Sequence, residues 1–87
     1  MTTTMRAKFS VQSVGSFKGA DGNKSHEILA MSPVCKSGGY PADGLDEDNT
    51  FAKWTPSGSL SLTITNPALW DQFKPGQKFY LDFTPAE

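Results

Sequence analysis

Apolar and polar residues alternate in two short segments near the end of the chain, and this pattern constrains the fold more than any other feature. Leu and Ile alternate with Ser and Thr over residues 60–65, and residues 78–83 show the same period of two. A period of two places successive side chains on opposite faces of a strand, so each segment is expected to bury one face. The sequence therefore predicts a small β domain.

The first third of the chain predicts a β-hairpin. Apolar residues take every second position over residues 5–11, and the alternation breaks at Ser13, where an inserted bulge residue would bend the strand. Asp21 followed by Gly22 is typical of a tight turn, because glycine readily adopts a positive φ. The return strand is expected over residues 25–35.

The rest of the chain predicts a long loop, two strands, a short helix and a last strand. The loop covers residues 36–50 and is rich in Gly, Pro and acidic side chains, and the strands follow over 51–55 and 59–65. Asn66 before Pro67 is typical of a helix start, because the Asn side chain can accept from an unpaired amide and proline loses no hydrogen bond there. One short helix is therefore expected before the last strand.

These elements predict a mainly β fold in a single domain spanning residues 1–87. A small five-stranded curved sheet or an OB-like barrel is expected, because a flat sheet of this size would leave one apolar face uncovered. In the alternative arrangement, the helix packs across one face of a small sheet. The expected core residues are Phe9, Leu62, Ile64, Phe79, Leu81 and Phe83.

Charge and cysteine content narrow the classes of protein that fit. The formal net charge is -1, and this argues against a general polyanion binder, because phosphate binding normally rests on an excess of Lys and Arg. Cys35 is the single cysteine, so no intramolecular disulfide is expected. No signal-peptide pattern and no apolar run of the ~20 residues needed to span a membrane is present. We expect a soluble protein in a reducing, cytosolic setting.

No combination of residues fills the roles of an active site. His26 is the single histidine and has no nucleophile motif to work with, and with Cys35 it gives too few ligands for zinc. The acidic residues over 43–49 lack the spacing of a calcium loop, so solvation or partner recognition is the simpler interpretation. We therefore expect no enzymatic activity, no cofactor and no metal site.

Binding is the better supported expectation. The chain has more aromatic side chains than a core of this size must hold, and several fall at loops or on the outward side of a strand. Aromatic rings beside basic side chains can stack nucleic-acid bases, and an acidic loop can recognise a charged partner. The candidate binding residues are Arg6, Lys8, Tyr40, Asp46, Glu47, Asp48, Lys53, Lys78 and Tyr80.

The opening MRAKFSVQSV and the run FAKWTPSGSLSLTITNPALWDQFKPGQKFYLDFTPAE resemble a group of short bacteriophage and prophage proteins of no settled activity. The likeness covers most of the chain, and it implies a phage origin and a small β fold. The matching residues are mostly turns, caps and core positions, so it implies no functional site. A more distant resemblance, of pattern only, is to the OB-type single-stranded-DNA-binding protein of filamentous phages.

Two functions are therefore expected as alternatives. The first is a small non-catalytic phage-type binding protein acting through protein-protein contacts, as a host-factor inhibitor or a virion component, in the host cytoplasm or the virion. The alternative is a single-stranded nucleic-acid-binding OB-like module. An exposed edge strand at the end of the chain could also support a homo-oligomer.

Overall fold

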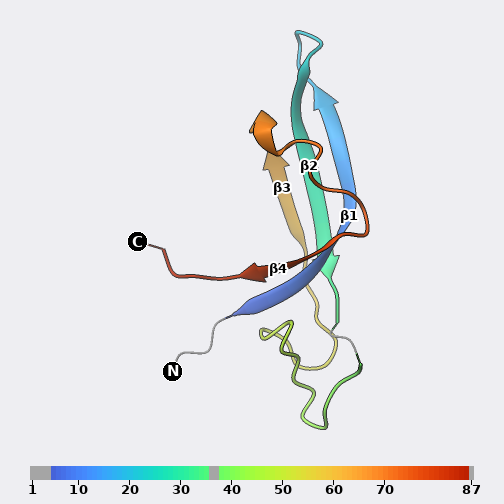
Figure 1. The fold of residues 1–87 in the computed structure, drawn as a ribbon, viewed down its shortest axis with the longest axis vertical. Coiled ribbons are helices and arrows are strands. Elements are labelled where there is room, and N and C mark those ends of the chain that lie inside the picture. The colour runs from blue at the N-terminus through green and yellow to red at the C-terminus, as the bar shows by residue number, and fades with distance from the viewer. Residues whose placement is uncertain (1–4, 36–37, 87) are drawn as a thin grey trace.

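The computed structural model describes residues 5–35 and 38–86, and its main element is an antiparallel sheet of four strands (Figure 1). The order in the sheet is β3-β2-β1-β4, so β3 and β4 form its two edges. The elements are β1 (Arg6–Lys18), β2 (Lys24–Pro33), β3 (Leu60–Ile64), the single 3-10 turn η1 (Pro67–Leu69) and β4 (Lys78–Asp82).

The β1–β2 hairpin is the longest part of the molecule and gives it an elongated shape of 55 × 32 × 17 Å. In Figure 1 its turn extends well beyond the ends of β3 and β4. The register of β1 on β2 shifts between Val11 and Ser13, so a bulge is present, but it lies at Gln12, one residue before the expected position Ser13. The predicted turn is confirmed, since Gly22 has a φ of 83° and lies in the connection between β1 and β2.

Strand β1 pairs with a different neighbour on each of its sides. Residues Phe9 to Lys18 pair with β2, whereas Arg6 to Ser10 pair with β4. Because β2 ends at Pro33, opposite Phe9, no strand of the described chain lies beside Arg6 and Lys8 on that side. The backbone groups of these two residues need other partners there.

The core lies on one face of the sheet. Its buried side chains come from the three strands β1, β2 and β3, and partly buried residues of β4 extend it. The connection from β3 to β4 packs Trp70 and Phe73 against this face, and Trp70 Nε1 donates to the Ile64 carbonyl at 2.9 Å. The buried apolar residues are Ala7, Phe9, Val11, Leu29, Met31 and Ile64.

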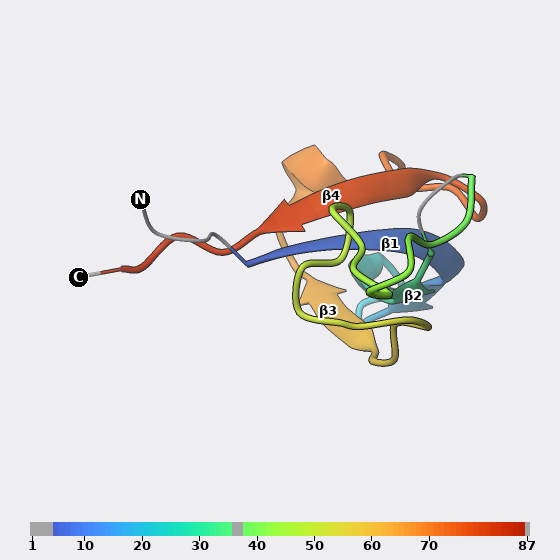
Figure 2. The ribbon, with the colours of Figure 1, turned by 90° about the horizontal axis from the view of Figure 1, so that it is seen from below.

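The expected fifth strand and the barrel are wrong. Over residues 51–55 the described backbone forms a single bridge, between Lys53 and Leu45, and Trp54 has a φ of 64° that a regular strand does not allow. Without that strand β3 and β4 stay on opposite sides of the central hairpin, so the sheet is open (Figure 2). The mainly β class is confirmed.

The expected short helix is also wrong, because the described chain forms only the 3-10 turn η1 there. The Asn66 cap is confirmed, because its side chain accepts from the Ala68 amide at 3.1 Å, but the helical turn ends at Leu69. Trp70 is already extended, and Asp71 has a φ of 63°. These two residues form contacts with the sheet that a continued helix would break.

The expected core is right in four positions and wrong in two. Phe9 and Ile64 are buried, and two residues of β4 pack beside them, Phe79 and Leu81. Leu62 is 48% exposed and Phe83 is 53% exposed, although the alternation places both on the core side. Strand alternation predicts the side of the sheet, but burial also needs a second layer above it.

The described residues also include no helix that is long and apolar enough to cross a membrane. Predictions that fall on residues 1–4, on the first two residues of the expected loop and on residue 87 lie outside the described ranges.

The burial pattern makes a stability prediction for two leucines that face each other across β2 and β3. Leu29 is 2% exposed, so its replacement by Ala should lower the free energy of unfolding by ~2–5 kcal/mol. Leu62 lies opposite it in the register and should lose less than ~1 kcal/mol in the same substitution, because it is half exposed. Urea unfolding measures both, and equal losses would contradict the assignment of the core.

Candidate functional site

The loop before β3 supplies hydrogen-bond partners to β1 where no strand lies beside it. The first of these partners is the side chain of Asn49. Asn49 Oδ1 accepts from the Lys8 amide at 2.8 Å, and its Nδ2 donates to the Val34 carbonyl at 2.7 Å. The Val34 amide in turn donates to the Lys8 carbonyl at 2.8 Å. Asn49 is 0% exposed, so its side-chain amide acts as a buried link between β1 and the chain leaving β2.

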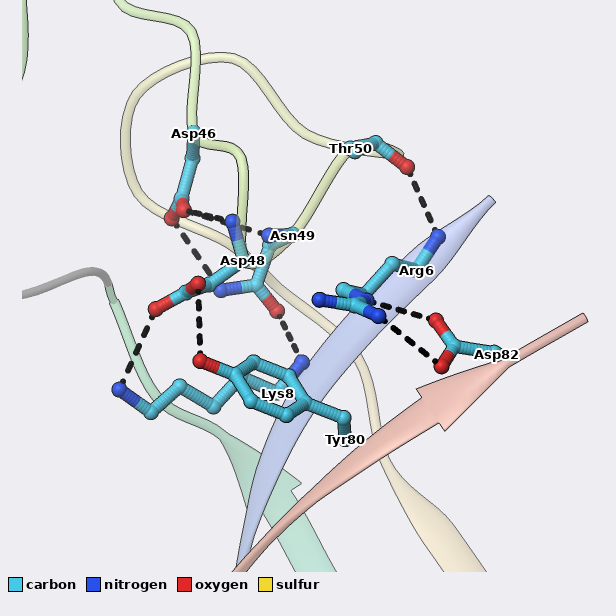
Figure 3. Close-up of polar contacts among 8 residues, drawn as sticks. All are labelled: Arg6, Lys8, Asp46, Asp48, Asn49, Thr50, Tyr80 and Asp82. Carbon is cyan, nitrogen blue, oxygen red and sulfur yellow. Dashed lines mark hydrogen bonds and ion pairs between the residues drawn. The ribbon is translucent and has the colours of Figure 1, made fainter. Parts of the chain in front are cut away.

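The next loop residue, Thr50, binds Arg6 on the same side of β1, as the close-up in Figure 3 shows. The Arg6 amide donates to Thr50 Oγ1 at 2.8 Å, and the Thr50 amide donates to the Arg6 carbonyl at 2.9 Å. Asn49 and Thr50, together with the Val34 amide, therefore satisfy the backbone groups that a neighbouring strand would otherwise bind.

Asp46 is a structural residue of this loop. It is 3% exposed, and its Oδ1 accepts from the amides of Asp48 at 2.9 Å and Asn49 at 3.2 Å. Its Oδ2 accepts from Asn49 Nδ2 at 3.1 Å. The carboxylate thus holds Asn49 in the orientation in which it reaches β1.

The outward face of β1 and β4 carries two linked ion pairs. Arg6 Nε lies 2.7 Å from Asp82 Oδ1, and Lys8 Nζ lies 3.2 Å from Asp48 Oδ2. Tyr80 joins them, because its hydroxyl donates to Asp48 Oδ1 at 3.1 Å and its ring lies 4.6 Å from Arg6 Cζ. The hydrogen bond to Asp82 and the charge of that carboxylate raise the pKa of Arg6.

Five of the nine predicted binding residues meet in this cluster or in the adjoining loop contacts of Asp46, and the other four lie elsewhere. Tyr40 packs against Trp54 with 5.9 Å between ring centroids, and burial raises the pKa of its hydroxyl. Lys53 and Glu47 lie in the loop, and Lys78 is exposed at the start of β4. The five that meet are Arg6, Lys8, Asp46, Asp48 and Tyr80, and all five make contacts within the chain.

A buried carboxylate at the other end of the sheet was not predicted. Glu27 is 2% exposed on the core side of β2, and its Oε2 accepts from Lys24 Nζ at 2.7 Å and from the Asp71 amide at 3.1 Å. The hydrogen bond from Lys24 is the main cause of a lowered Glu27 pKa. The sequence does contain the signal, because Glu27 shares the alternating positions of Leu29 and Met31.

An apolar groove of about 170 Å³ opens where the start of β1, the end of β4 and the turn before β3 come together. Ala7 and Phe9 are buried there, whereas Met5, Phe51 and Phe83 are 43%, 40% and 53% exposed. The groove is therefore lined by large apolar side chains that water reaches. Within the described chain, no group of three or more His, Cys, Asp or Glu residues is placed to hold a metal ion.

Comparisons with protein-family models, with curated proteins and with solved structures find no match to this chain.

The role of Asn49 predicts a large loss of stability when its side chain is removed. Asn49→Ala should lower the free energy of unfolding by ~2–4 kcal/mol, because the Lys8 amide and the Val34 carbonyl lose their partner in a partly buried place. The matched control is Asn23→Ala in the exposed hairpin turn, with an expected loss below ~0.5 kcal/mol. A loss at Asn49 no greater than at Asn23 in urea unfolding would contradict this role.

Because Glu27 is buried and its pKa is lowered, we expect the folded protein to lose stability in acid. The pKa of Glu27 is lowered from 4.5 by folding, so its contribution is fully present above pH 4.5 and is lost as the pH falls through the lowered value. Glu27→Gln should therefore reduce the dependence of the melting temperature on pH between neutral and acid solution.

The control for this prediction is Asp43→Asn, at an exposed site in the loop. The Asp43 carboxylate accepts from the Leu45 amide through Oδ1, and an asparagine keeps an oxygen for that bond. Because this side chain is exposed, the variant should change the pH dependence of the melting temperature less than Glu27→Gln does. Identical pH profiles for wild type and Glu27→Gln would refute the prediction.

Proposed function

We propose that this chain is a small non-catalytic binding protein of phage type that acts through protein-protein contacts, as a host-factor inhibitor or a virion component. The observation that supports this most is the apolar groove beside Met5, Phe51 and Phe83. Aromatic residues and Met are enriched in protein interfaces, and exposed apolar patches often mark them. The phage setting rests on the sequence resemblance.

The ion pairs on the outward face favour a protein partner over a nucleic acid. Arg6 and Lys8 would be main contributors to a single-strand binding face, together with Lys78 and the ring of Tyr80. Both Arg6 and Lys8 are paired with carboxylates, and a phosphate would have to displace those carboxylates. A single-stranded nucleic-acid-binding module is therefore the alternative, with less support.

The test is capture of a partner by the groove, with one variant inside it and one outside. The tagged protein is used as bait in lysates of infected and uninfected host cells, and the captured protein is then purified and titrated by calorimetry. Phe83→Ser should weaken its binding at least ~10-fold, as expected when a large side chain at an interface is lost. Leu69→Ser is the matched control, because Leu69 is 49% exposed but lies in η1, outside the groove.

Two outcomes would count against this function. Unchanged affinity of Phe83→Ser for the captured protein would exclude the groove as the binding surface. Fluorescence anisotropy with a labelled single-stranded oligonucleotide tests the alternative, which predicts binding at low salt that falls steeply as salt rises. Such binding, without any captured protein, would replace the first function by the second.

A further inference from the structure

The outer side of β4 is an edge whose backbone groups can be assigned from the pairing with β1. The Phe83 amide donates to the Met5 carbonyl at 3.0 Å, so Phe83 directs its backbone groups toward β1. Lys8 lies opposite Tyr80, yet its amide and carbonyl bond on the other side, to Asn49 and Val34. In an antiparallel ladder, successive residues direct their backbone groups to opposite sides of the strand. The amides and carbonyls of residues 78, 80 and 82 therefore point away from β1.

The sequence of β4 is complementary to itself when it is read in the opposite direction. We propose that two copies of this chain form a symmetric dimer in which β4 pairs antiparallel with its partner, centred on Tyr80. In that register Lys78 lies opposite the partner's Asp82, and Phe79 lies opposite the partner's Leu81. Opposite charges and apolar pairs directly across two strands both stabilise a sheet. The two sheets would join into one continuous sheet.

The charges select this register over its neighbours. If the partner strand is shifted by two residues, each charged side chain of β4 lies opposite Tyr80 or an uncharged residue beyond β4. If it is shifted by four residues, Lys78 lies opposite the partner's Lys78, or Asp82 lies opposite the partner's Asp82. Like charges directly opposite each other destabilise a sheet. The Tyr80-centred register is thus the one that pairs both charges of β4.

The surroundings of β4 allow this pairing. The Asp82 side chain is 45% exposed, and a carboxylate that binds Arg6 still has lone pairs for a second cation. Phe79 and Leu81 are partly buried on the core side, so the pairing would extend the apolar face across the two copies.

The other edge of the sheet is less suited to self-pairing. The Ile64 carbonyl on β3 is already bonded by Trp70, and residues 60–64 include no charged side chain that would select a register. The proposed dimer therefore uses β4, and it does not depend on the function proposed above.

Charge-reversal variants test the dimer. The measurement is sedimentation equilibrium of the full chain over a range of concentrations. The wild type should show a reversible monomer-dimer equilibrium. Lys78→Asp should raise the dissociation constant at least ~10-fold, because two cross-strand attractions become repulsions. Adding Asp82→Lys restores opposite charges across the two strands, and adding Arg6→Glu as well keeps an ion pair with residue 82. This triple variant should recover most of the dimer. Lys18→Asp, at the far end of β1, is the control and should behave as wild type.

Two results would overturn the proposal. One is a wild type that remains monomeric at the highest concentration reached. The other is a dimer whose dissociation constant is unchanged by Lys78→Asp, or is raised without recovery in the triple variant. Far-ultraviolet circular dichroism checks that each variant is folded, so a change in assembly can be told from a loss of structure.

Discussion

The structure depends on how the unpaired backbone of β1 is satisfied beyond the end of β2. An exposed strand edge can bind another chain, and a partly buried amide without a partner costs free energy. Here Asn49 and Thr50 occupy the place of a strand beside Lys8 and Arg6. The long loop is therefore a part of the sheet, and its acidic residues Asp46 and Asp48 position and anchor it.

The sequence predicted the features that depend on neighbouring residues. The alternation in the strands, a bulge in β1, the turn at Gly22 and the cap of Asn66 are local effects, and all four are present, with the bulge at Gln12 and not at the expected Ser13. The sequence did not predict that Asn49 reaches Lys8, because the two residues are far apart in the chain and no local pattern links them. The same holds for the contact between Glu27 and the Asp71 amide, which lies just beyond the end of η1.

The candidate binding residues show the same limit. Period-two alternation placed Lys8, Lys78 and Tyr80 correctly on the outward side, but it could not show that Asp48 pairs with Lys8 and Tyr80. The charges of Arg6, Lys8 and Asp48, which look available in the sequence, are used within the fold. The structure leaves exposed the apolar groove beside Phe83 and the outer edge of β4, two features that depend on the sheet having stayed open.

Amide hydrogen exchange measured by NMR tests the central claim most directly, namely that the loop replaces a strand beside β1. The Lys8 and Arg6 amides should exchange as slowly as those of Ala7 and Phe9, which face β4, and the Lys8 amide should lose its protection in Asn49→Ala. A Lys8 amide that exchanges at the rate of an unprotected peptide in the wild type would contradict the account.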